Sequence, residues 1–306
     1  MVLVVAVEEY LCSPLIRLSG LLYPGCRDIL GIKATRKLSP IFILKLFLWY
    51  LPFKARAVIT PSDLGGRLVR LMLDWARLLG KEVLIVPVHN HPSHRDRPLP
   101  IVKRYLDLTT LRVVGGFARH SKIIVNDAPM REFFLGLGYA PERLVLMEGW
   151  ITRLFREEQA ARYPVVFFTE VLQEVCPEVF GKNAERVVSM LERGALRDLY
   201  IKFHPRESEE AIGFYRKTFG RFANAHFIEG PEDSMAIINR AGAVMASFSS
   251  VLLEGLWLGK KVIILDNPVF RQTLLNSYLQ AGENHFVMGD NPDLEGLRRF
   301  LGKGRI

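Results

Sequence analysis

The feature that most constrains the fold is a repeated alternation of short apolar runs with helical patterns, joined by small polar loops. It is clearest in residues 199 to 266, where the runs LYIKF and AVMA each end in a polar loop that leads into a helical pattern. Strands that alternate with helices are typical of parallel sheets covered by helices. The sequence therefore predicts an α/β fold of two Rossmann-like domains, residues 1–150 and 151–306, facing a cleft, with a connector at 150–163.

Two loops in this region place polar groups at the carboxyl ends of predicted strands. His204 and Pro205 follow the first apolar run, and Ser249 and Ser250 follow the second. The serines come directly before a helical pattern, so hydroxyl and backbone N–H groups gather at a helix N-terminus, which favours anions. We interpret both loops as parts of one ligand site, because ligands bind at the carboxyl ends of such strands. The structural alternative is that His204 caps a strand and the serines cap a helix.

The order and spacing of these loops resemble the HP and SS/ST motifs of bacterial sialyltransferases and polysialyltransferases. Similar elements occur in capsule Kdo transferases and CDP-glycerol glycerophosphotransferases. The likeness covers mainly residues 160 to 270, and all of these families use a cytidine-nucleotide donor. It implies the GT-B fold, with an acceptor-side first domain and a donor-binding second domain. It also implies that His204, Ser249 and Ser250 contact the donor phosphate or its nucleotide.

Side chains close to these motifs extend the predicted donor site. Lys202 and Arg206 flank the histidine and carry the positive charge that would neutralise a departing phosphate. Thr169 ends the apolar run PVVFF, and Glu254 lies in the helical pattern after the serines. The predicted donor-binding residues are His204, Pro205, Lys202, Arg206, Ser249, Ser250, Thr169 and Glu254.

Transfer to an acceptor hydroxyl also needs a general base. Glu8–Glu9–Tyr10 follows the first predicted strand and resembles the acidic motif that carries the base in the sialyltransferase families, with tyrosine where those families have glycine. Asp63 ends another predicted strand, and His91 lies in the segment HNHPSHRDR. The candidates for the base are therefore Glu9, His91 and Asp63, in that order. The alternative for Glu8 and Glu9 is a solvated pair of carboxylates.

The composition narrows the classes of partner. A net charge of +9 implies an anionic partner, but the sequence has no aromatic-interleaved basic repeat or helix-turn-helix signature, which argues against nucleic acid. Pro92 prevents a helical zinc arrangement of the nearby histidines, so we expect no metal or other cofactor. The sequence also lacks a glycine-rich dinucleotide fingerprint and a GxxxxGK[ST] loop. Its three separated cysteines predict reduced thiols in a cytoplasmic protein.

Residues 33 to 56 form a second distinctive segment. The apolar run IFILKLFLWYLPF has about 13 residues, fewer than the ~20 that span a bilayer. Five cations flank it, namely Lys33, Arg36, Lys37, Lys54 and Arg56. One interpretation is an internal helix packed on the sheet. The other is a segment that lies against an anionic membrane surface through Phe42, Phe47 and Trp49, which would make the cytoplasmic protein peripheral on the inner face of the cell membrane.

Together these features predict a metal-independent glycosyltransferase that uses a cytidine-nucleotide-activated donor to extend a surface glycan or lipid-linked acceptor. The process would be polysaccharide or capsule biosynthesis. Three alternatives stay open: a CDP-glycerol-type glycerophosphotransferase, a sugar-nucleotide 2-epimerase, and an inactive GT-B-fold partner in capsule assembly. The epimerase shares the two-domain fold and needs no separate acceptor, whereas an inactive partner would neither bind nor hydrolyse the donor.

Overall fold

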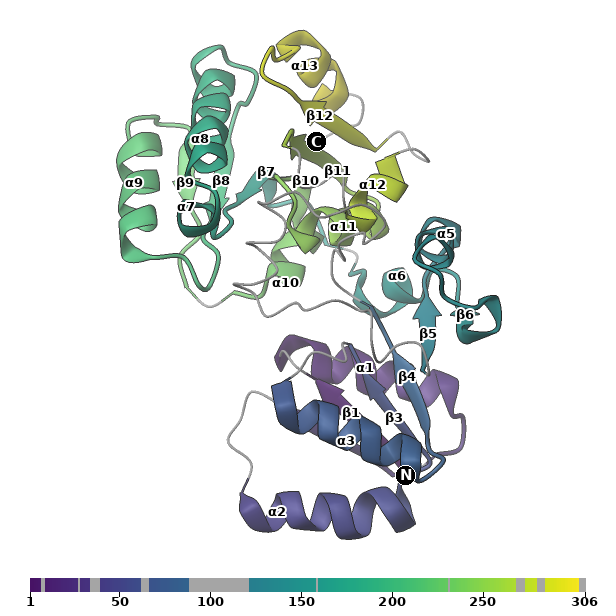
Figure 1. Cartoon of the computed structure of the whole chain (residues 1–306). Coiled ribbons are helices and arrows are strands. Elements are labelled where there is room, and N and C mark those ends of the chain that lie inside the picture. Colours follow the sequence, from purple (N-terminus) through teal and green to yellow (C-terminus); the bar gives the residue numbers. More distant parts are fainter. Residues whose placement is uncertain are drawn as a thin grey trace. The chain divides into compact units, whose positions relative to one another are not determined.

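The computed structural model describes residues 1–6, 9–26, 28–33, 39–61, 66–87, 121–157, 159–230, 232–267, 273–279 and 284–302. These residues divide into two compact units, the first ending at Phe155 and the second beginning at Arg156. Each unit contains one parallel six-stranded sheet with helices on it (Figure 1). The predicted α/β fold with two Rossmann-like domains is confirmed.

The first unit has the strand order β2-β1-β3-β4-β5-β6, and every neighbouring pair is parallel. Its strands are β1 (Val2–Ala6), β2 (Ile29–Lys33), β3 (Ala57–Thr60), β4 (Glu82–Ile85), β5 (Lys122–Val125) and β6 (Leu144–Leu146). Its helical elements are α1 (Glu9–Leu22), α2 (Pro40–Lys45), the π-helical η1 (Leu46–Lys54), α3 (Gly66–Leu78), α5 (Ala128–Gly136), the 3-10 turn η3 (Pro141–Arg143) and α6 (Trp150–Phe155). Val2 to Val5 of β1 and Ala57 to Ile59 of β3 are buried, which places these two strands in the core of the unit.

The second unit has the strand order β12-β11-β10-β7-β8-β9, again with every pair parallel. Its strands are β7 (Tyr163–Phe168), β8 (Leu199–Lys202), β9 (Ala225–Phe227), β10 (Ala241–Ala246), β11 (Lys261–Leu265) and β12 (His285–Met288). Its helices are α7 (Leu172–Val175), α8 (Pro177–Glu192), α9 (Glu209–Phe219), α10 (Ser234–Asn239), α11 (Ser250–Trp257), α12 (Leu274–Leu279) and α13 (Leu294–Gly302).

In the second sheet, the order in which the chain adds strands reverses at β7 and β10. The chain runs outward from β7 through β8 to β9, and then returns to place β10 on the other side of β7. This is the strand order of dinucleotide-binding Rossmann sheets, and the crevice at the carboxyl ends of the two central strands is where such sheets bind ligands. Residues 169–170 and 247–250 follow these two strands.

Close packing fixes the helix that follows β10. Gly255 of α11 lies so near the sheet that an added Cβ would be 2.5 Å from Cγ2 of Val244 and 3.1 Å from Cγ2 of Val262. A larger residue would therefore push α11 away from β10 and β11. This contact positions the N-terminus of α11 at the carboxyl end of β10.

The apolar segment expected at 33–56 forms α2 and η1 and has two different sides. Leu46 and Leu51 are fully buried in the core of the first unit. Phe42 and Phe47 are partly buried against the same core, so neither is the exposed aromatic that a membrane-facing interpretation requires. The exposed side chains of the segment include Ile41, Leu44, Leu48, Trp49 and Phe53. The packed-helix interpretation is thus correct for one side of the segment only.

The connector expected at 150–163 begins with a helix instead. Trp150, Ile151, Leu154 and Phe155 are buried in the first unit, and Nη2 of Arg17 donates a hydrogen bond of 2.9 Å to the carbonyl oxygen of Leu154. The prediction of a connector is wrong for residues 150–155 because their apolar side chains, spaced at i, i+1, i+4 and i+5, form one face of α6.

Candidate functional site

One buried carboxylate joins the carboxyl ends of β7 and β10. Glu170 is only 6% exposed; its Oε2 accepts a hydrogen bond of 2.8 Å from the backbone N–H of Ser247, and its Oε1 accepts one of 2.9 Å from that of Phe248. Burial raises the pKa of Glu170, and the nearby donor groups of Phe248, Ser247 and Ser249 oppose the rise. The carboxylate therefore fastens the loop before α11 to the end of β7.

A polar side chain from α8 holds the same loop from another direction. Asn183 is buried, and its Nδ2 donates to Oγ of Ser247. It lies in the apolar stripe of α8, three residues after Phe180 and four before Val187, both of which are buried. The sequence analysis missed this residue, although a buried-side asparagine within a helical apolar stripe is a usable signal for a polar contact in the core.

Thr169 fastens the loop after β8 to the end of β7. Its Oγ1 accepts a hydrogen bond of 3.0 Å from the backbone N–H of His204 and donates one of 2.5 Å to Oε2 of Glu207. Within this loop, Nδ1 of His204 accepts a hydrogen bond of 3.1 Å from the backbone N–H of Arg206. A neutral imidazole whose Nδ1 accepts carries its proton on Nε2. Nε2 is therefore the atom of His204 that can donate to a ligand.

These hydrogen bonds bring part of the predicted donor set together. Thr169 and His204 are in direct contact, and the exposed Pro205 and Arg206 belong to the same loop. Lys202 has another partner, since its Nζ donates a hydrogen bond of 2.7 Å to the carbonyl oxygen of Gly230. Burial lowers the pKa of Lys202, and the nearby carboxylate of Glu229 opposes this shift.

The two serines have different surroundings. Ser249 is the N-cap of α11, and its Oγ accepts a hydrogen bond of 3.4 Å from the backbone N–H of Val251, as the structural alternative expects. Ser250 is the first residue of the helix and is half-buried, and no hydrogen bond to its hydroxyl occurs within the described ranges. Glu254 lies one turn further along α11 and is buried. Ser250 is thus the serine whose hydroxyl can face a ligand.

None of the three candidates for a general base has its side chain among the described residues. Glu9 is the first residue of α1, but its side chain lies outside the described part of the structure, and so do Asp63 and His91. In the sequence, Glu9 follows β1 and Asp63 follows β3, and these two strands are neighbours in the sheet. Their roles stay predictions.

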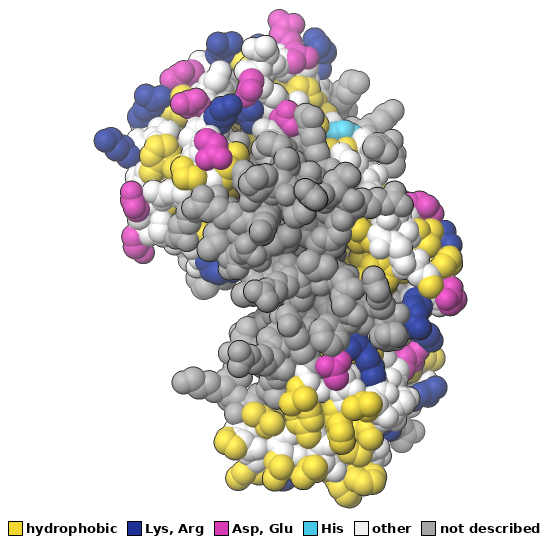
Figure 2. Space-filling view, viewed as in Figure 1, with side chains coloured by type: hydrophobic (Ala, Val, Ile, Leu, Met, Phe, Trp, Pro, Cys, Tyr) yellow, Lys and Arg dark blue, Asp and Glu magenta, His cyan; other side chains and the backbone are white. Residues whose placement is uncertain are grey.

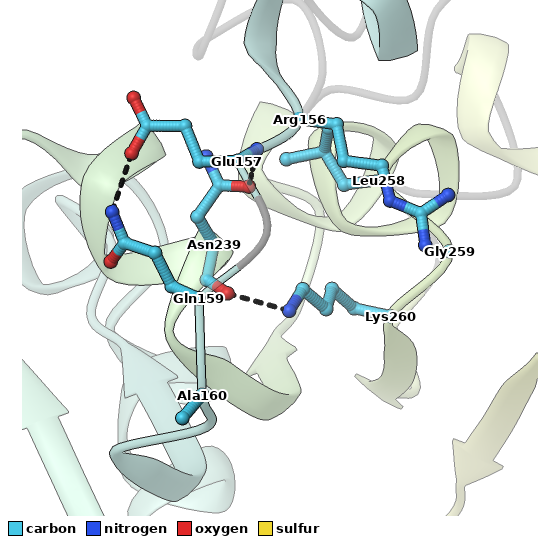
Figure 3. A pocket seen from close by; sticks show the side chains of 8 residues that line it. All are labelled: Arg156, Glu157, Gln159, Ala160, Asn239, Leu258, Gly259 and Lys260. Atoms are coloured by element: carbon cyan, nitrogen blue, oxygen red, sulfur yellow. Dashed lines mark hydrogen bonds between the residues drawn. The ribbon is translucent and has the colours of Figure 1, made fainter.

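A pocket of about 520 Å³ lies at the opposite end of the second sheet, where β7 and β11 begin. Its lining includes Arg156, Asn239 and Lys260, and Nζ of Lys260 donates a hydrogen bond of 2.7 Å to the carbonyl oxygen of Asn239 (Figure 3). Burial and then the charge of Arg156 lower the pKa of Lys260. Rossmann sheets bind ligands at the carboxyl ends of their strands, so we assign the candidate site to the loops around Glu170 and Thr169.

The fold is that of known GT-B enzymes. UDP-GlcNAc 2-epimerase from Methanocaldococcus jannaschii has a TM-score of 0.61 at 13% identity, over 98% of this chain and 91% of that one. The Neisseria meningitidis UDP-GlcNAc 2-epimerase bound to UDP-GlcNAc has a TM-score of 0.63 at 12% identity, over 99% and 90%. Anabaena HepE in complex with UDP and glucose has a TM-score of 0.55 at 11% identity, over 98% and 88%. The expected GT-B fold is therefore confirmed. No protein-family model and no curated protein sequence matches the chain.

Proposed function

We propose that the second unit binds the diphosphate of a nucleotide-activated sugar at the two loops fastened to β7. The observation that carries this proposal is the pair of anchors at the switch point: Glu170 fixes the serine loop, and Thr169 fixes the loop of His204. Both anchors limit loop motion before a ligand arrives, which lowers the entropy cost of binding. Nε2 of His204, the hydroxyl of Ser250 and the exposed guanidinium of Arg206 are then the groups that would contact the phosphates.

The nucleotide we propose is a uridine nucleotide in place of the cytidine nucleotide expected from sequence. The Neisseria structure holds UDP-GlcNAc and the Anabaena structure holds UDP, and both share the fold of this chain. The same comparisons favour the alternative of a sugar-nucleotide 2-epimerase over that of a glycosyltransferase, since the UDP-GlcNAc 2-epimerases superpose on this chain with TM-scores of 0.61 and 0.63. We therefore propose 2-epimerisation of a UDP-sugar as the reaction.

This reaction sets a clear chemical demand. Inverting C2 without net hydrolysis breaks the C2–H bond on one face of the sugar and forms a new C2–H bond on the other, so one group must take a proton and another must return one. We propose that Glu9, Asp63 and His91, the candidates identified in the sequence, include these groups. Because the reaction needs two acid/base groups, we expect at least two of these three residues to take part in it.

The test is isotope exchange. Incubation of the full chain with UDP-GlcNAc in D₂O, without any acceptor, should place deuterium at C2 of the sugar, and mass spectrometry or proton NMR measures it. Deuterium at C2 in the absence of acceptor supports the epimerase. UDP release that depends on an added glycan or lipid-linked acceptor, with no exchange at C2, contradicts the epimerase and supports a transferase. UDP binding with neither result identifies an inactive partner.

A glycosyltransferase that extends a lipid-linked acceptor in polysaccharide or capsule assembly is our second candidate. The observation that favours it is the exposed apolar side of α2 and η1, because a lipid-linked acceptor is presented at a membrane surface. An epimerase acts on a water-soluble substrate and has no need of such a surface.

The serines give a prediction that separates ligand contact from helix capping. Ser250→Ala should weaken UDP binding at least about tenfold, because a hydroxyl that donates to a phosphate oxygen makes a charge-assisted hydrogen bond of about 1.5–3 kcal/mol, with little change in stability. Ser249→Ala should lower the unfolding free energy by about 1 kcal/mol through loss of the N-cap and leave UDP affinity within twofold. Calorimetric titration with UDP and thermal unfolding of both variants measure the two effects. If both variants bind UDP like the wild type, Ser250 has no part in the site.

A further inference from the structure

The first unit carries an apolar surface that its own packing leaves uncovered. On α2 and η1 the exposed side chains are Ile41, Leu44, Leu48, Trp49 and Phe53, of which Ile41 and Phe53 are 70% and 71% exposed. Figure 2 shows hydrophobic side chains spread over the part of this unit where Figure 1 draws α2 and α3. Soluble proteins rarely expose so many large apolar side chains together unless the surface meets a partner.

A neighbouring helix continues this surface. Leu71, Trp75 and Leu78 are exposed on α3, and their i, i+4, i+7 spacing puts them on one side of that helix. Nε1 of Trp75 donates a hydrogen bond of 3.1 Å to the carbonyl oxygen of Phe47 in η1, so this side of α3 borders the apolar segment. We call the exposed apolar side chains of α2, η1 and α3 the α2–α3 face.

The charged side chains in and beside α2 and η1 are positive, and Asp74 of α3 is paired with Arg77 at 2.9 Å. The sequence from Ile29 to Ser62 contains no aspartate or glutamate. Lys45, Lys54 and Arg56 are exposed in and beside the apolar segment, and Nζ of Lys54 lies 5.7 Å from the ring centre of Trp49. Lysines next to exposed leucine, phenylalanine and tryptophan are the composition of helices that lie at the surface of anionic membranes.

The dimensions of the segment fit a position in the plane of a membrane. The stretch from Pro40 to Lys54 would be about 22 Å long at ~1.5 Å per residue, shorter than the ~30 Å hydrocarbon core of a bilayer. No helix within the described residues could span a membrane. Leu46 and Leu51 tie one side of the segment to the core, which leaves the other side for lipid. The adjacent rings of Trp49 and Phe53, 5.5 Å apart, suit the headgroup region.

We propose that the α2–α3 face docks onto the surface of an anionic lipid bilayer, with α2 and η1 parallel to the membrane plane. The exposed leucine, isoleucine and phenylalanine side chains enter the boundary between headgroups and acyl chains. Lys45, Lys54 and Arg56 contact the anionic headgroups. The proposal uses no residue of the second unit, so its failure would leave the proposed nucleotide site untouched.

Vesicle flotation of the full chain tests this proposal. The protein should float with vesicles that contain about one third phosphatidylglycerol in phosphatidylcholine, and binding should fall at least tenfold at high salt or with phosphatidylcholine alone. A Leu48→Ser, Trp49→Ser, Phe53→Ser variant should lose at least tenfold in vesicle affinity. Leu146→Ser, a change of one exposed leucine of β6, is the matched control and should bind like the wild type.

Charge-reversal variants test the role of the lysines in vesicle binding. Lys45→Glu with Lys54→Glu should weaken binding to the anionic vesicles at least tenfold, whereas Lys217→Glu on the exposed side of α9 should not. Circular dichroism and thermal unfolding confirm that each variant is folded. Absence of flotation at low salt would overturn the proposal. So would a wild-type dimer in light scattering that the triple serine variant converts to a monomer, because a second copy of the chain would then cover the face.

Discussion

Replacing Glu170 with alanine is expected to lower the unfolding free energy by about 3 kcal/mol and to remove measurable UDP binding. Two backbone N–H groups, those of Ser247 and Phe248, lose their acceptor in the change. An unsatisfied buried donor costs about 1–3 kcal/mol, and relief from burying the carboxylate offsets part of that sum. Urea unfolding followed by circular dichroism measures the loss. Glu185→Ala, which removes an exposed carboxylate from α8, should change stability by less than about 0.5 kcal/mol.

The Glu170→Gln variant measures how much of the stability depends on the carboxyl group itself and how much on having a hydrogen-bond acceptor at this position. The amide keeps one oxygen acceptor but turns an NH₂ group toward another donor, so its loss in stability should be smaller than that of the alanine variant. Because burial raises the pKa of Glu170 above its ordinary value of 4.5, the wild type should have its greatest advantage over Glu170→Gln below pH 4.5 and lose part of it as the pH rises. An alanine variant that unfolds like Glu185→Ala would contradict the anchoring role.

The second large effect is expected for His204→Ala. A hydrogen bond from Nε2 to a phosphate oxygen is charge-assisted and contributes about 1.5–3 kcal/mol, so UDP affinity should fall between about tenfold and a hundredfold. The fold should survive, because Thr169 bonds the backbone N–H of residue 204 and not its ring. Calorimetry with UDP measures the change. His226→Ala, which alters a half-exposed histidine of β9 in the same unit, is the matched control and should bind UDP normally.

A second experiment identifies the nucleotide that the protein prefers. A thermal-shift panel of UDP, UMP, CDP, CMP and GDP on the wild type should rank UDP first. Stabilisation by CMP or CDP above UDP would restore the cytidine donor that the HP and serine motifs imply. Equal UDP affinity in the wild type and in a folded His204→Ala variant would remove His204 from the site.

Strand ends were predictable because each is marked by a local change from apolar to polar residues. His204 and Ser249 both follow buried runs, and the structure places them after β8 and β10. The role of Glu170 was not predictable, because its partners are 77 and 78 residues away in the sequence and the strand order that brings them together is a property of the whole sheet. Tertiary hydrogen bonds of this kind leave no local pattern.

The apolar segment of the first unit illustrates a different limit. Its residues are apolar on nearly every side, so the sequence pattern contains no contrast that could tell which side is buried. Of the aromatic residues chosen from sequence, Trp49 is exposed, whereas Phe42 and Phe47 are partly buried against the core. For Trp150 the local mixture of charges suggested a connector, although its apolar neighbours at helical spacing form a buried face.

The carboxyl group of Glu170 also occupies the place that a bound anion would take at the loop that it holds. Backbone N–H groups collected before a helix ordinarily attract sulfate or phosphate from solution. A carboxylate on the same chain is present at this loop at an effective concentration that free ions do not match. The amides of Ser247 and Phe248 are therefore closed to small inorganic anions, and a protein kept in phosphate buffer would retain this loop unchanged.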